Sequence, residues 1–369
     1  MRVGGQMSQI IKTTTPGAAG YSRPADWLAL PAVVAGEHTV VGLYAVYDTD
    51  SNFIAFSCRG AYTVDWGDGS APENVADNVT AEHLYDYADL GAETLSTRGY
   101  RQAIIVITMQ GAEVFTVVDF AKMHSQAGLN DYSWLDVKMA GAAVTSAKFG
   151  NGDRESRMLE QFEYVGGNSL TSAAYMFAWC SSLQSVPLFD ISGATSTRQM
   201  FIGNYSLRNV PLFDTSSVLS TSQMFQNCLS LQSVPLFDTS SVTNMTYMFL
   251  GAQSIQSVPL FDTSSVKTIY WMFRNAFSLQ NVPALDTSSV TNTTSMFSFC
   301  HSLQAAPFAG TVADISYASC RLARAEIVDI FNGLGSAAKT ITITGNWGIP
   351  DLTAADRLIA TAKGWTIVE

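Results

Sequence analysis

The stretch SVPLFDTSSVTNMTYMF at residues 233–249 decides the fold, because the chain repeats it at a fixed interval. SVPLFDTSSVKTIYWMF follows 24 residues later, and NVPALDTSSVTNTTSMF follows 24 residues after that. A fixed period of this kind is typical of solenoids, in which each repeat is one coil stacked on its neighbours. The Met of each Met-Phe pair keeps this step at Met176, Met200, Met224, Met248, Met272 and Met296, the proline at Pro187, Pro211, Pro235, Pro259, Pro283 and Pro307, and the aspartate at Asp190, Asp214, Asp238, Asp262 and Asp286.

Each period predicts a strand followed by a short helix. SLQSVPLF at 230–237 carries the pattern L-x-x-V-x-L, the strand signature of leucine-rich repeats. After it, apolar residues recur at offsets typical of one helix face, with Asp238 or Ser240 as the N-cap. The leucine, valine and Met-Phe columns would then form a continuous core. The residues on the predicted helix face are Val242, Met245, Met248, Phe249 and Ala252.

The flanking segments predict other modules. Short β-branched and aromatic runs at 38–120 favour a β-sandwich. The end of the chain reads as two helices, RAEIVDIFNGL and LTAADRLIATAKG with Thr353 as N-cap, and two strands, KTITITG and WTIVE. The expected fold class is α+β: a sandwich, then a strand–helix solenoid, then an α/β cap. The expected divisions are an extended arm at 1–37, the sandwich at 38–120, a linker and N-terminal cap at 121–158, the repeats at 159–308 and the C-terminal cap at 309–369.

Composition excludes several classes of protein. The formal net charge of −11, with 14% charged residues, argues against a nucleic-acid binder. No apolar run reaches the roughly 20 residues that a membrane helix needs, so membrane insertion is not expected. Five cysteines without CxxC spacing predict neither a disulfide framework nor a zinc site. Neither end carries a secretory, wall-sorting or lipidation signal, so none of these routes of export is expected.

Candidate chemistry is sparse. The column from Asp190 to Asp286 would either bind calcium or cap the following helices. Asp65 and Asp68, in DWGDG, would either bind calcium or form a tight turn. No nucleophile stands in an activating motif, no phosphate-binding glycine loop is present, and the four histidines are scattered in sequence. We therefore expect no enzyme activity, no catalytic residues, no metal and no cofactor.

Specificity should lie at the positions that vary from repeat to repeat. The position before each Met-Phe pair and positions two and four after it change identity. If these positions face outward, aromatic side chains gather there, and exposed aromatic clusters mark binding surfaces. The predicted partner-binding patch is Tyr247, Tyr270, Trp271 and Phe277.

Two resemblances extend this prediction. YTVDWGDGS at 62–70, followed by EHLYDY at 82–87, resembles PKD-type immunoglobulin-like domains, although ADLGAETLSTRGY replaces the usual short run after the histidine. The repeated phrase, over 159–308, closely resembles the BspA-like leucine-rich repeats of bacterial surface proteins and phage virion proteins. The C-terminal segment is similar to the tail that closes such arrays in phage proteins.

These resemblances imply a structural virion-surface protein of a tailed bacteriophage, assembled in the host cytoplasm. It would be a tail fibre or receptor-binding component; the alternatives are a capsid decoration protein or head fibre, and a bacterial cell-surface adhesin. The expected partners are other virion proteins, bound through the arm and the Ig-like domain, and a host-surface protein or glycan. Oligomers are compatible with this prediction.

Overall fold

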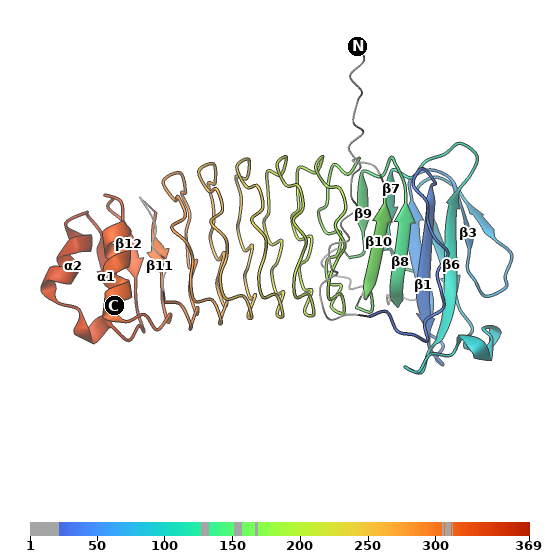
Figure 1. Ribbon diagram of the computed structural model, residues 1–369, viewed down its shortest axis with the longest axis horizontal. Helices are drawn as coiled ribbons and strands as arrows, with labels where there is room; N and C mark the ends of the chain where they lie inside the picture. The colour runs from blue at the N-terminus through green and yellow to red at the C-terminus, as the bar shows by residue number, and fades with distance from the viewer. Residues whose placement is uncertain are drawn as a thin grey trace, which may run out of the picture.

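The computed structural model describes residues 22–126, 133–150, 157–166, 169–304, 306, 311 and 313–369, so part of the predicted arm and Pro307 lie outside the described residues. The protein is mostly β and forms a straight rod, with two packed sheets at one end, coils in the middle and two helices at the other end (Figure 1). The coils form a β-solenoid of about nine turns. Neither helix is long and apolar enough to cross a membrane, as judged over the described residues.

The larger N-terminal sheet has the strand order β10-β8-β1-β6-β3-β4. Its central strand β1 pairs antiparallel with β6 and β8, and β10 pairs parallel with β8. The central strands are rich in β-branched residues, which suit a sheet whose inner face is buried. The six strands are β1 Thr39–Val46, β3 Tyr62–Asp65, β4 Glu73–Val75, β6 Arg101–Met109, β8 Trp134–Ala140 and β10 Gln161–Val165.

The smaller sheet has the order β5-β2-β7-β9 and faces the larger one. The Phe56 ring of β2 lies 6.1 Å from Tyr62 and 6.2 Å from Trp134, which both belong to the larger sheet. Strands β8 and β9 fall within 121–158, the segment predicted as a linker, and both belong to these sheets. The remaining elements here are β2 Phe53–Cys58, β5 Thr80–Leu84, β7 Val117–Asp119 and β9 Ser146–Lys148, with 3-10 turns at Tyr87–Asp89 and Ala92–Thr94.

The predicted strand–helix form of the repeats is wrong. In the described part of the repeats no residue is helical, and the coils are held by turns and isolated bridges between neighbouring coils. Within the described residues, the two α-helices both lie in the C-terminal cap. The α+β class is therefore replaced by a mostly β solenoid.

Left-handed backbone positions explain why no helix forms. Tyr247 has a φ of +59° and Gly251 a φ of +69°, and an α-helix of L-residues cannot continue through such positions. The N–H of Leu250 donates to the carbonyl of Tyr247 at 3.1 Å, which closes a four-residue turn, whereas the N–H of Phe249 donates to Met272 in the next coil at 2.9 Å. The apolar spacing of three that predicted a helix thus comes from consecutive β-turns.

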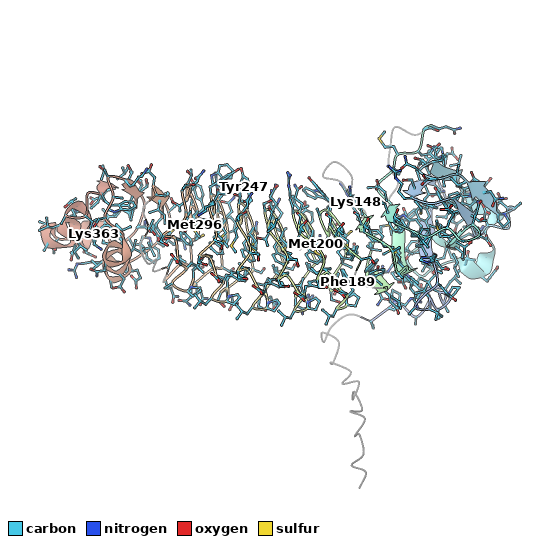
Figure 2. All side chains as sticks on the ribbon, turned by 90° about the horizontal axis from the view of Figure 1, so that it is seen from above. Lys148, Phe189, Met200, Tyr247, Met296 and Lys363 are labelled. Atoms are coloured by element: carbon cyan, nitrogen blue, oxygen red, sulfur yellow. The ribbon has the colours of Figure 1, made fainter. Side chains whose placement is uncertain are left out.

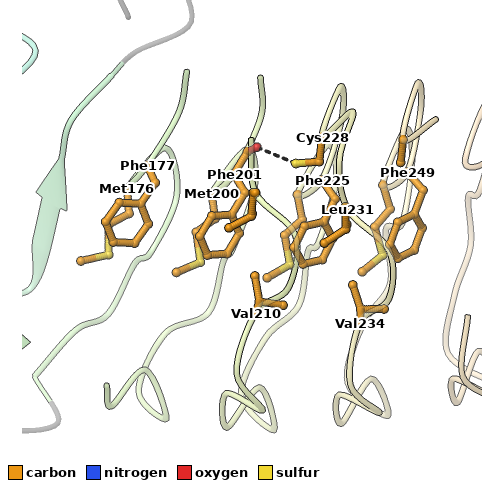
Figure 3. Packing of buried hydrophobic residues seen from close by; sticks show 14 of the residues in the cluster. Met176, Phe177, Met200, Phe201, Val210, Phe225, Cys228, Leu231, Val234 and Phe249 are labelled. Atoms are coloured by element: carbon orange, nitrogen blue, oxygen red, sulfur yellow. Dashed lines mark hydrogen bonds between the residues drawn. The ribbon is translucent and has the colours of Figure 1, made fainter. Parts of the chain in front are cut away.

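The core is one stack of aromatic rings. Phe201, Phe225 and Phe249 lie parallel, with successive centroids 5.6 Å apart (Figure 3). The stack continues into the sheets, where Phe149 lies 4.5 Å from Phe120, and into the cap, where Tyr317 follows Phe297 at 5.1 Å. Buried residues from the sheets, the coils and the cap belong to a single hydrophobic cluster. Each methionine before these phenylalanines is buried as well.

The last leucine of the L-x-x-V-x-L pattern points outward, against the prediction of an inward strand face. The N–H of Phe237 donates to the carbonyl of Pro235 at 3.0 Å, a three-residue turn that turns Leu236 away and returns Phe237 to the core. Phe237 is 3% exposed. The outward leucines are between 58% and 65% exposed and form what we call the leucine ridge: Leu188, Leu212, Leu236 and Leu260.

The Asp-Thr-Ser-Ser segment ties each coil to the next. The buried Thr239 hydroxyl donates to the carbonyl of Asp262 one coil on, at 2.8 Å. Asp238 accepts hydrogen bonds from the backbone N–H of Ser240 at 3.0 Å and from its hydroxyl at 2.7 Å. The aspartates therefore cap tight Asx turns rather than the helices that the sequence predicted.

The C-terminal cap follows the predicted element order. α1 Arg324–Gly333 and α2 Ala354–Thr361 cover the end of the stack, and Thr353 forms a capping box with Asp356. The parallel strands continue the inter-coil ladder beyond the repeats, so that the last apolar face is covered. The strands are β11 Ile315–Ser316, β12 Thr340–Thr342 and β13 Thr366–Val368, with a 3-10 turn at Ile349–Asp351.

Candidate binding surface

Two left-handed positions in each coil carry the side chains that vary. One precedes the Met-Phe pair and the other lies two residues after it. These residues sit at turns outside the buried Met-Phe column, which stays constant while they change from coil to coil. The first column is Tyr175, Gln199, Gln223, Tyr247, Trp271 and Ser295, and the second is Trp179, Gly203, Asn227, Gly251, Asn275 and Phe299.

Several of these positions hold residues that the backbone disfavours. A left-handed conformation costs an L-residue other than glycine roughly 1–2 kcal/mol, and asparagine tolerates it better than aromatic residues do. The second column has glycine or asparagine in most coils, yet Trp179 and Phe299 occupy it with φ values of +61° and +66°. Such outliers are a reason to look for function.

Three residues of the predicted patch are in contact. The Tyr247 ring lies 4.8 Å from Tyr270 and 5.4 Å from Trp271, and both pairs are edge-to-face. A hydrogen bond between the Tyr247 and Tyr270 side chains raises the pKa of Tyr247. Tyr247 lies on the opposite side of the rod from Phe189 (Figure 2). The three residues come from two successive coils and form one aromatic surface.

Arg274 links this surface to the fourth predicted residue. Its guanidinium lies 4.2 Å from the Trp271 ring and 5.7 Å from Phe299. Phe299 contacts His301 at 6.3 Å, and His301 stacks on Phe277 at 5.3 Å with the rings 5° from parallel. We call the connected group the aromatic edge: Tyr247, Tyr270, Trp271, Arg274, Phe277, Phe299 and His301.

Sequence reasoning missed Arg274, Phe299 and His301 as members of the group. Phe299 and His301 occupy the same variable columns as Trp179 and Ser181, so their positions were available as a signal. Arg274 follows the Met-Phe pair directly, a position that other coils fill with smaller or uncharged residues.

Phe277 and Phe299 are 37% and 40% exposed, which leaves part of each ring accessible to a partner.

Charges in the coils are segregated. Between residues 169 and 304 every acidic residue belongs to the aspartate column, and the stretch contains no glutamate. Hydrogen bonds from the hydroxyl and then from the N–H of the serine two residues on lower the pKa of these carboxyl groups, so they are ionised at neutral pH. The aspartates with a lowered pKa are Asp214, Asp238, Asp262 and Asp286.

In the described part of the structure, neither the aspartate column nor the DWGDG turn brings together enough ligands for a calcium ion. Within the described ranges no group of three or more His, Cys, Asp or Glu could hold a metal ion. In the DWGDG turn, Asp65 accepts the N–H of Gly67 at 3.0 Å, and Asp68 accepts that of Ser70 at 3.0 Å. The carboxylates thus hold the turn itself.

His83, on strand β5 of the smaller sheet, binds the DWGDG turn of the larger sheet. His83 Nε2 lies 2.7 Å from Asp68 Oδ2, and its ring stacks on Trp66 at 4.8 Å. Burial alone would raise the pKa of Asp68, but the hydrogen bonds from Ser70 and His83 outweigh it and lower the pKa. A Cβ on Gly67 would lie 2.2 Å from the carbonyl oxygen of Ile104, so only glycine fits there.

The cysteines of the coils and the cap fill a structural slot, while Cys58 lies on β2. All five are buried and free. The Cys228 thiol donates to the carbonyl of Phe201 at 3.0 Å (Figure 3), and in the coil before it the amide of Asn204 donates to Phe177 at 2.7 Å. Burial raises the pKa of the Cys228 thiol well above its usual range, so it is neutral and poorly nucleophilic.

A groove of about 1160 Å³ lies where the coils meet the larger sheet. Leu188 and Leu212 of the leucine ridge form part of its wall, and the Arg23–Asp136 ion pair, at 2.8 Å, forms another part. The charged groups of this pair are engaged with each other, and the groove brings together no activated nucleophile. We therefore take the aromatic edge, rather than this groove, as the candidate binding surface.

The comparisons with known proteins concern only the coils. The profile of a family described as "Mycoplasma protein of unknown function, DUF285" matches residues 195–308. This interval includes every residue of the aromatic edge and leaves the two sheets and the cap unmatched. No curated protein matches the chain.

Proposed function

We propose that this protein is a non-catalytic structural protein on the surface of a tailed-phage virion, where it holds the aromatic edge outward for attachment to a host. The observation that carries the proposal is the aromatic edge itself. Three of its residues, Tyr247, Trp271 and Phe299, occupy variable, backbone-disfavoured positions in three successive coils of a scaffold whose buried Met-Phe column is constant. Trp, Tyr and Arg are the residues enriched at binding hot spots.

The rest of the chain supports this role. We assign the repeats to the BspA-like class on their repeated phrase, and the two N-terminal sheets to the PKD-type Ig-like class on the DWGDG turn and His83. The sheets and the arm that precedes them would contact other virion proteins, as an oligomer or a monomer. Because the sheets share one core with the coils, the aromatic edge is held rigidly relative to the anchoring end.

Mass spectrometry of purified virions tests the proposal. The chain should be found in intact particles at a stoichiometry that matches a fibre or decoration protein. Its recovery with separated tails would support a receptor-binding component, and its recovery with heads would support a capsid decoration protein or head fibre. If the chain is absent from particles that carry its gene, it is not a virion protein.

A bacterial cell-surface adhesin is the second candidate. The observation that favours it is the match of residues 195–308 to a family described from Mycoplasma, a bacterium. Protease treatment of intact cells distinguishes the two. If the protease releases peptides of the coils from intact cells that produce no phage particles, the adhesin is supported. If the chain is fully protected from the protease, the adhesin is contradicted.

A further inference from the structure

Arg274 presents unused hydrogen-bond donors on the aromatic edge. Its guanidinium lies 4.2 Å from the Trp271 ring, and within the described part of the chain it has no ion pair and no side-chain hydrogen bond. A guanidinium stacked on an indole keeps its N–H groups directed outward in its own plane. That arrangement fits the two oxygens of a carboxylate.

The electrostatics of the coils favour an anion at this place. Asp190, the first residue of the aspartate column, directly follows Phe189 in the sequence, and Phe189 lies on the other side of the rod from Tyr247 (Figure 2). The three turns that carry the aromatic edge, at 245–253, 269–277 and 293–301, contain no acidic residue, and Arg274 is their one Lys or Arg. Arg198 over Tyr175, at 5.9 Å, repeats the arginine–aromatic pairing further along the rod. An approaching carboxylate therefore meets attraction at the aromatic edge.

The succession of rings along the rod favours a chain of sugar units. The aromatic edge supplies rings in three successive coils, so an extended ligand meets more than one ring. Aromatic faces stack against the C–H faces of sugars. Asn275, Thr294 and Ser295 add uncharged hydrogen-bonding groups for sugar hydroxyls.

Resting on the proposed attachment function, we infer that the aromatic edge binds a carboxylate-bearing glycan. Arg274, held over Trp271, pairs with the carboxylate, and the exposed rings of Phe277 and Phe299 pack against the sugar rings. The ligand class is an acidic oligosaccharide that contains uronic or sialic acid units. An acidic protein segment shares the carboxylate but lacks the stacking faces.

Calorimetric titration of the full chain tests this inference. The probes are an oligogalacturonate and sialyllactose, with a carboxyl-reduced oligogalacturonate of the same length and polyglutamate for comparison. The wild-type chain should bind at least one acidic oligosaccharide, and Arg274→Gln should weaken that binding by at least about 10-fold, because a bidentate charged hydrogen bond is lost. Arg208→Gln, outside the aromatic edge, should bind like the wild type.

Three outcomes would overturn the inference. They are no binding of either acidic oligosaccharide, equal binding of the carboxyl-reduced oligomer, and stronger binding of polyglutamate than of the sugars. Thermal unfolding of each variant, expected to match the wild type, shows that any loss is local. The chain could fail all of these titrations and still be present in virions, so this inference and the proposed function fail separately.

Discussion

At the scale of single residues, the left-handed positions show that the fold requires a turn there but accepts different side chains. The fold needs a turn at Trp271 but not a tryptophan, since other coils place glutamine or serine there. The φ of +57° at Trp271 makes the aromatic side chain a cost to stability. Met272, its neighbour, is fully buried in the stack. Substitution at Trp271 should therefore cost much less stability than substitution at its neighbour Met272.

Replacing Trp271 by asparagine should leave the free energy of unfolding within about 1 kcal/mol of the wild type, because asparagine accepts the left-handed conformation. Met272→Ala should lower it by about 2–5 kcal/mol, since a buried side chain leaves a cavity. Denaturant unfolding of the two variants measures both changes. Equal destabilisation would mean that Trp271 is part of the core.

At the scale of elements, the 24-residue phrase predicted the repeat and its buried Met-Phe column but not the shape of the coil. Apolar spacing of three is shared by helices and by consecutive β-turns, and only the sign of φ at Tyr247 and Gly251 distinguishes them. That sign depends on hydrogen bonds to the next coil, which a single repeat does not contain. In the cap, Thr353 and Asp356 lie within one turn of helix, so the local sequence was sufficient.

The outward turn of Leu236 gives a matched pair of substitutions. Leu236→Ala should change the unfolding free energy by about 0.5 kcal/mol or less, because surface substitutions seldom do more. Phe237→Ala should cost about 3–5 kcal/mol. Chemical denaturation would show the difference. A larger effect at Leu236 than at Phe237 would mean that Leu236 faces the core, as the L-x-x-V-x-L pattern predicted, and would contradict the turn described above.

The capping box of α2 gives a prediction about pH. Hydrogen bonds from Arg324, and then from Thr353, lower the pKa of Asp356 from 3.8 to about 2. A lowered folded pKa means that this stabilisation is complete above about pH 4 and is lost as the pH falls towards 2. Asp356→Asn should unfold at a lower temperature at pH 7 and lose less stability between pH 4 and pH 2.

Thermal unfolding followed by circular dichroism across this range measures the effect, with Asp329→Asn, an exposed change on α1, as the control. The control should keep the pH dependence of the wild type. Parallel curves for Asp356→Asn and the wild type would show that the ion pair with Arg324 does not stabilise the cap.

At the scale of the whole molecule, the phenylalanine stack joins modules that the sequence presents as separate. Phe120 and Phe149 belong to the sheet region and Tyr317 to the cap, yet all lie in one series with the repeats. The sequence could not show this, because Phe120, Phe149 and Phe177 are not separated by 24 residues. The sheets thus serve as the first cap of the solenoid.

A charge placed in the middle of this stack should disturb several coils. Met248→Asp puts an unpaired carboxylate where the wild-type side chain is fully buried, at a cost of several kcal/mol. Hydrogen exchange should show faster exchange in the coils on both sides of residue 248, and Met248→Leu should be close to the wild type. Unchanged exchange and thermal unfolding would refute the continuous core.

The candidate site was predictable in position but not in extent. Variation within fixed columns pointed to Tyr247, Tyr270, Trp271 and Phe277, and three of them are in contact. The link to Phe277 runs through Arg274, which depends on the direction of a long side chain. Sequence spacing carries no information about such a direction.

The most direct test of the aromatic edge as an attachment surface is the adsorption rate of virions that carry Trp271→Ala. We expect adsorption to host cells to fall by about 10-fold or more, as for the loss of a binding hot spot. Incorporation into particles and thermal unfolding should stay unchanged. Trp347→Ala, which removes an arginine-stacked and exposed tryptophan from the cap, should adsorb normally. Wild-type adsorption by the Trp271→Ala particles would contradict the account.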